Sequence, residues 1–139
     1  MLLVTTPGDL PTVLFLCVHN AGRSQMALGW FEHLADGRAV AYSAGSDPAD
    51  LVDPAAVAAM AEVGIDLGGA TPRHWTAADL DRADIVVTMG CGDECPLVPG
   101  THYQDWPLPD PAGKGLDAVR PIRDDIGRRV RLLLDEFTD

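Results

Sequence analysis

The sequence has 139 residues, a formal net charge of −11 and three cysteines. Its length suits one domain, and its 47% hydrophobic and 22% charged residues exclude global disorder. The acidic balance argues against nucleic acid or an anionic membrane as partner, since both favour clustered lysine and arginine, but it allows a small, locally basic anion site. No targeting segment or membrane span is expected. The odd cysteine count favours a reducing cytoplasm over a disulfide framework.

After a flexible leader over residues 1–11, strand-like and helix-like patterns alternate through a single domain spanning residues 12–139. In chain order, the predicted elements are a strand at 13–18, a helix at 24–34, a strand at 40–43, helices at 55–63 and 76–82, strands at 84–89 and 103–106, and a helix at 118–137. This alternation predicts an α/β fold with a parallel sheet. Ligands of such sheets lie beyond the carboxyl ends of the strands, so the loops after the strands are the places to look for chemistry.

The loop after the first strand reads Cys17-Val-His-Asn-Ala-Gly-Arg23-Ser24 and leads into a helix. Such a loop can turn successive backbone N–H groups inward, and the helix N-terminus adds further donors and a partial positive charge. The guanidinium of Arg23 can donate two parallel hydrogen bonds to an oxyanion, and the Ser24 hydroxyl can donate one to a thiolate at Cys17. A buried, inert thiol at a strand end is the alternative. The pattern and its position favour a nucleophile in an oxyanion loop.

The other two cysteines, Cys91 and Cys95, follow the strand at 84–89, so a parallel sheet puts Cys91 at the same edge as Cys17. A relay of thiol–disulfide exchange needs such proximity, and Gly90 and Gly92 give the backbone freedom to move. A buried thiol pair and a metal site are the alternatives. Two cysteines without a second pair make zinc a poor explanation, so no metal is expected.

Two aspartates, Asp105 near the end of the last strand and Asp110 after it, are candidates for a general acid. Loss of an oxygen from an oxyanion requires its protonation, and neighbouring negative charge favours the protonated form of a carboxyl group. A turn around the Asp110-Pro111 dipeptide is the structural alternative.

With these motifs the chain resembles the arsenate reductases built on the low-molecular-weight protein tyrosine phosphatase fold. The resemblance spans about residues 13–137, and its further landmarks are Ser43-Ala-Gly45, Cys95-Pro96 and Asp110-Pro-Ala-Gly113. It implies a three-layer fold, with a four-stranded parallel sheet flanked by helices. It also implies that arsenate, or phosphate or sulfate as mimics, binds the loop formed by Cys17, Val18, His19, Asn20, Ala21, Gly22, Arg23 and Ser24, and that Asp110 is the acid.

The resemblance further implies the electron path. In thioredoxin-coupled members three cysteines act in turn, here Cys17, Cys91 and Cys95, with no bound cofactor. Only three residues separate Cys91 from Cys95, fewer than is usual in that group. So short a segment can loop out less, which hinders transfer of the disulfide to Cys95. A related branch uses mycothiol with a mycoredoxin, and there these two cysteines are bystanders. A phosphotyrosine phosphatase is the third reading, but Ala112 and Gly113 stand where such enzymes carry ring-stacking aromatic residues.

Overall fold

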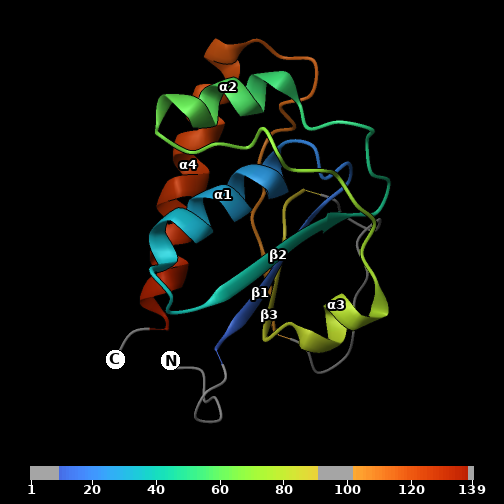
Figure 1. The fold of residues 1–139 in the computed structure, drawn as a ribbon, viewed down its shortest axis with the longest axis vertical. Helices are drawn as coiled ribbons and strands as arrows, with labels where there is room; N and C mark the ends of the chain where they lie inside the picture. The colour runs from blue at the N-terminus through green and yellow to red at the C-terminus, as the bar shows by residue number, and fades with distance from the viewer. Residues whose placement is uncertain (1–9, 91–101, 138–139) are drawn as a thin grey trace.

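The computed structural model describes residues 10–90 and 102–137 (Figure 1). Cys91 and Cys95 therefore lie outside the described residues, as does most of the predicted leader. Eight elements follow in chain order: β1 (Thr12–Cys17), α1 (Arg23–Ala35), β2 (Val40–Gly45), α2 (Pro54–Glu62), α3 (Ala77–Arg82), β3 (Ile85–Thr88), β4 (His102–Asp105) and α4 (Leu116–Asp135). Within this described part, no helix is long and apolar enough to cross a membrane.

The four strands form one parallel sheet in the order β2-β1-β3-β4, which confirms the predicted fold class. Register brings the strand ends together, because Cys17 pairs with Gly45 on one side and Leu16 pairs with Thr88 on the other. The Cys17 thiol therefore emerges at the carboxyl edge of the sheet, next to the ends of β2 and β3.

Alternate residues of β1 serve two hydrophobic cores, as the two-residue period of a strand requires. Val13, Phe15 and Cys17 belong to the larger core under α1, α2 and α4, whereas Leu14 and Leu16 face the smaller core on the α3 side (Figure 1). The Phe15 ring lies 5.8 Å from that of Phe31 and 5.7 Å from that of Trp106. Because β1 is covered on both faces, its continuous apolar run is a buried central strand.

The observed ends of the elements lie within one or two residues of those predicted, and two of the differences have a structural cause. Strand β2 continues to Gly45 because its last residues pair with the end of β1. Helix α4 begins two residues earlier than predicted and contains Pro121. Pro121 is the sixth residue of the helix and removes one hydrogen bond, to the carbonyl of Asp117, whereas the N–H groups of Ala118 and Val119 already bond to the Gly115 carbonyl. The early start is therefore compatible with the proline.

Helix α3 has only six residues and depends on its cap. Thr76 and Asp79 form a capping box: the Asp79 N–H donates to Thr76 Oγ1 over 3.1 Å, and the Thr76 N–H donates to Asp79 Oδ2 over 2.8 Å. Asp79 is 3% exposed, and its carboxylate also pairs with Arg73 and Arg82. Burial of Asp79 raises its pKa, but the hydrogen bonds from Arg73 and Thr76 outweigh that effect and lower the pKa from 3.8 to about 2.

This lowered pKa predicts a loss of stability in acid. The folded protein holds the Asp79 proton less tightly than the unfolded chain, so its contribution is complete above about pH 4 and is lost as the pH falls towards 2. The contribution is at most about 2 kcal/mol, and an Asp79→Asn variant lacks it. Urea midpoints of both proteins at pH 6 and pH 2.5 should show a smaller pH dependence for the variant. Equal pH dependence would contradict this assignment.

Candidate active site

The loop between β1 and α1 is fixed by the segment that follows β2. The carbonyl oxygens of Cys17, Val18, His19 and Ala21 accept hydrogen bonds from the backbone N–H groups of Ser46, Asp47, Ala49 and Asp53, over 3.3, 2.8, 3.0 and 2.8 Å. In a trans peptide the N–H points opposite to the C=O. The N–H groups of the same four peptides are therefore turned to the other side of the loop, as an anion cradle requires.

The start of α1 adds donors to the same side. The first helical bond runs from the Met26 N–H to the Gly22 carbonyl over 2.9 Å, so the earlier N–H groups of the helix have no partner within it. Asn20 adopts a left-handed conformation with φ of 49°, which asparagine tolerates and which lets the chain turn sharply into the helix.

The Cys17 sulfur lies 2.9 Å from Ser24 Oγ, and the contact is buried. A neighbouring hydrogen bond leaves the Ser24 hydroxyl proton available for the sulfur. Asn20 Nδ2 donates to Ser24 Oγ over 2.7 Å, while Asn20 Oδ1 accepts from the N–H of Arg73 over 3.0 Å. An N–H can only donate, so the Asn20 amide has one possible orientation, and the Ser24 hydroxyl proton is free to point at the sulfur. Ser24 is thus placed to stabilise a Cys17 thiolate.

Arg23 is 5% exposed and is held by groups from two other segments. Its Nη1 donates to the Leu108 carbonyl over 3.2 Å, and its Nη2 lies 3.8 Å from Asp110 Oδ2. Gly90, with φ of +81°, packs so closely on the guanidinium that a Cβ there would collide with Nη1. The segment just after β3 therefore limits the positions that the Arg23 side chain can take, and it can do so only because residue 90 is glycine.

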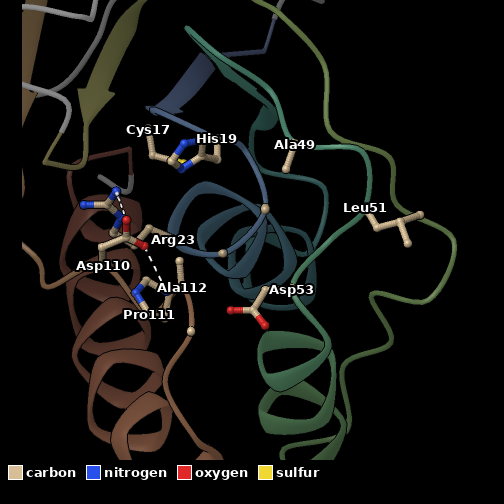
Figure 2. Close-up of a pocket in the computed structure, with 12 residues that line it drawn as sticks. Cys17, His19, Arg23, Ala49, Leu51, Asp53, Asp110, Pro111 and Ala112 are labelled. Atoms are coloured by element: carbon tan, nitrogen blue, oxygen red, sulfur yellow. Dashed lines mark hydrogen bonds and ion pairs between the residues drawn. The ribbon is translucent and has the colours of Figure 1, made fainter.

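The two candidate acids lie in different surroundings. Asp110 lines the same cavity as Cys17 and Arg23, and its Oδ1 accepts from the Ala112 N–H over 3.0 Å (Figure 2). Its side chain is 47% exposed, so it can exchange protons with water. Asp105 instead accepts from Thr88 Oγ1 over 2.8 Å and does not line that cavity. Of the two, only Asp110 is placed beside the cysteine and the arginine.

The cavity itself has a volume of about 210 Å³, and Cys17, Gly22, Arg23 and Asp110 are among its lining residues. Drug-sized ligands occupy pockets of roughly 300–1,000 Å³, so this volume suits a small ion. A Cβ on Gly22 would lie 2.7 Å from Pro111 Cγ, which shows how closely the loop and the segment before α4 approach. Pro111 thus brings Asp110 to the rim of the cavity.

Asp53 is a cavity residue that the sequence did not single out. It caps α2, with Oδ1 accepting from the Ala55 N–H over 3.0 Å, and it lines the cavity on the α2 side, whereas Asp110 lies on the side leading to α4 (Figure 2). Its other oxygen is buried and has no hydrogen-bond partner among the described residues. The Asp-Pro pair before a predicted helix signalled the cap, but nothing in the sequence indicated the cavity.

We expect Asp53→Asn to bind phosphate roughly threefold to tenfold more tightly, because it removes a negative charge from the wall of an anion site. Asparagine is an equally good helix cap, so the fold is kept. Calorimetric titration with phosphate at low salt measures the change. The matched control is Asp50→Asn, which removes an exposed carboxylate of the same segment that does not line the cavity. Unchanged or weaker binding by Asp53→Asn would contradict the expected repulsion.

Residues 10–90 and 102–137 contain no group of three or more histidine, cysteine, aspartate or glutamate side chains placed to hold a metal ion. Within these ranges, residues of the predicted oxyanion loop and Asp110 lie around one cavity. The prediction that Cys91 and Cys95 lie at this edge falls on residues that the structure does not describe.

Comparison with known proteins identifies the family. The sequence profile described as "Low molecular weight phosphotyrosine protein phosphatase" matches residues 12–139. A "Putative arsenate reductase" of Halobacterium salinarum is 42% identical over 128 residues, which are 88% of this chain and 90% of that protein. The chain belongs to the arsenate reductases of this family. A "Glutaredoxin arsenate reductase" of Synechocystis is 37% identical, with 91% of this chain and 98% of that protein covered.

Solved structures of arsenate reductases share the fold. One, described as "in the phosphate binding state", is 34% identical, with a TM-score of 0.83 and coverage of 93% of this chain and all of the other. A thioredoxin-dependent arsenate reductase of Corynebacterium glutamicum is 39% identical, with a TM-score of 0.77 and 92% of this chain covered. This chain spans 61% of that longer one. An arginine phosphatase of Geobacillus stearothermophilus, at 23% identity and a TM-score of 0.74, shows the shared fold alone.

Proposed function

We propose that this arsenate reductase uses Cys17 as its nucleophile and passes the resulting disulfide through Cys91 and Cys95 to thioredoxin. The observation that carries the proposal is the placement of the Cys17 sulfur at an anion-sized cavity, 2.9 Å from a Ser24 hydroxyl whose proton is free to point at it. Arg23 and the N–H groups of residues 18–24 hold the oxyanion in this proposal. Phosphate and sulfate, as tetrahedral anions, are expected to compete with arsenate.

The first step forms a bond between the Cys17 sulfur and arsenic. One arsenate oxygen leaves as water after Asp110 has supplied a proton, and the arsenic is still As(V). The Cys91 thiolate then attacks the Cys17 sulfur. The electron pair of the S–As bond passes to arsenic, which departs as As(III) arsenite, while Cys17 and Cys91 are oxidised to a disulfide.

The last steps restore the nucleophile. The Cys95 thiolate attacks the Cys91 sulfur, which releases the Cys17 thiolate and leaves a Cys91–Cys95 disulfide. An external dithiol protein then reduces that disulfide. The printed names of the similar proteins support such a partner, since one is thioredoxin-dependent and another is a glutaredoxin arsenate reductase.

A single-turnover experiment tests the relay. Reduced protein is mixed with arsenate without external thiol, and disulfides are mapped by mass spectrometry after quenching. The expected result is one arsenite per chain and a Cys91–Cys95 bridge. Cys95→Ser should stop at a Cys17–Cys91 bridge, and Cys91→Ser should release no arsenite.

Two outcomes would overturn the relay. Absence of arsenite until mycothiol and a mycoredoxin are added would instead assign the chain to the mycothiol-dependent branch, which the short Cys91–Cys95 spacing keeps as the second candidate. Faster turnover of an aryl phosphate than of arsenate would assign it to the phosphatases. Ala112 and Gly113 argue against the phosphatase, because they put no aromatic ring at the cavity wall to stack on an aryl group.

A further inference from the structure

The orientation of Asn20 depends on a segment that contributes no side chain to the cavity. Asn20 Oδ1 accepts from the Arg73 N–H over 3.0 Å and from Gln25 Nε2 over 3.2 Å. These two donors hold the amide so that its Nδ2 faces Ser24 Oγ and Ser43 Oγ. If Arg73 moved, Asn20 would lose one of the two donors that keep its NH₂ group on Ser24.

Arg73 itself is held by main chain and side chain together. Its carbonyl accepts from the Gly45 N–H over 2.9 Å, and the Trp75 N–H donates to the Gly45 carbonyl over 3.2 Å, so residues 73–75 pair with the end of β2. Its guanidinium forms a two-pronged pair with Asp79, from Nη1 to Oδ2 over 2.8 Å and from Nη2 to Oδ1 over 2.9 Å. Two parallel bonds fix orientation as well as distance.

Asp79 is the fixed end of this arrangement. It sits on α3, across the sheet from α1 (Figure 1), with 3% of its surface exposed. Besides Arg73 it accepts from the Thr76 N–H over 2.8 Å and from Arg82 Nη2 over 3.1 Å. A buried carboxylate with four donors is rigid, whereas an Arg73 side chain that is 40% exposed would be mobile without it.

We propose that Asp79 is a positioning residue for the nucleophile, acting through Arg73, Asn20 and Ser24 to keep a hydrogen-bond donor on the Cys17 sulfur. Every link is a hydrogen bond of 3.1 Å or less: Asp79 to Arg73, Arg73 to Asn20, Asn20 to Ser24, and Ser24 to Cys17. Asp79 touches neither the cavity nor the cysteine. Its effect is on how readily the thiolate forms.

The inference builds on Cys17 as nucleophile, but its test needs no arsenate. The rate of Cys17 alkylation by iodoacetamide is measured from pH 5 to 10, with the Cys17 peptide quantified by mass spectrometry. This readout separates the inference from the proposed relay, because Cys17 reactivity can be scored even if the protein turns out to use another reductant.

We expect Asp79→Asn to slow Cys17 alkylation at pH 7 by roughly threefold to tenfold, and to move the midpoint of the pH profile upward, as residues along a coupled network do. Arg73→Lys keeps the charge facing Asp79 but not the two-pronged pair, so it should lose part of the rate, whereas Arg73→Gln should behave as Asp79→Asn does. The matched control is Arg82→Gln, which removes another ion pair of Asp79 and a stacking contact with Tyr42 but leaves Arg73 in place.

Each alternative has its own result. Arg82→Gln should lower the melting temperature without moving the profile, and an equal shift in that control would show that lost stability alone is responsible. In an Asn20→Ala background, Asp79→Asn should have no further effect, because the link is already cut. An undiminished effect in that background, or no effect in the single variant, would overturn the proposal.

Discussion

A Cys17→Ser variant is expected to lose arsenate reduction by at least about 10⁴-fold, as active-site nucleophile knockouts do. A serine hydroxyl is not ionised at neutral pH, and its oxygen cannot form the disulfide whose formation supplies two electrons to arsenic. The measurement is arsenite released in a single turnover. Since the loop N–H groups and Arg23 are untouched, the variant should still bind phosphate.

Ser24→Ala is the companion variant for this prediction. It keeps the sulfur and removes only the donor 2.9 Å from it. We expect a smaller loss, on the order of tenfold to a hundredfold, that diminishes at high pH because alkali replaces the missing stabilisation of the thiolate. Arsenite production by Cys17→Ser would show that another thiol attacks arsenate and would refute the assignment.

Arg23→Lys is expected to lower kcat/KM for arsenate by about 10²–10³-fold, as removal of a single oxyanion-stabilising group does in other enzymes. Lysine keeps the charge but not the planar fork, which here is held by the Leu108 carbonyl and Asp110 and backed by Gly90. Phosphate inhibition should weaken in parallel, because the same group binds the mimic.

The control for Arg23→Lys is Arg38→Lys, since Arg38 lies just beyond the other end of α1, where it bonds the carbonyls of Leu34 and Ala35. It should leave kcat/KM within about twofold, as surface substitutions generally do. If Arg23→Lys also stayed within that range, the loop N–H groups alone would hold the oxyanion.

The sequence predicted those parts of the fold that a regular spacing of apolar residues marks. The apolar run of β1 and the helical spacing of α1 indicated a buried central strand followed by a covering helix, and the structure confirms both. The end of β2 could not be placed, because it depends on pairing with β1 rather than on its own residues. The start of α4 was predicted two residues late, although the predicted helix already contained Pro121.

The residues of the candidate site likewise fall into those that the sequence reveals and those that it does not. The loop after β1 carries its signal in side chains, so Cys17, Arg23 and Ser24 could be picked out by spacing. The groups that hold the loop are mostly main chain, such as the N–H groups of Asp47 and Arg73. Because almost any residue type supplies an N–H group, the sequence does not reveal them. Asp53 was missed because nothing in the sequence shows that its side chain, besides capping α2, lines the cavity.

The segment between β2 and α2 supports the loop entirely through its own backbone, with N–H groups that any residue except proline supplies. Apart from Asp53, whose carboxylate lines the cavity, its side chains can therefore change without disturbing the backbone that holds the loop. Leu51, 78% exposed at the mouth of the cavity, is one such side chain. Substitutions at such exposed positions can thus alter which molecules approach the thiol, while the backbone geometry that receives the anion stays the same.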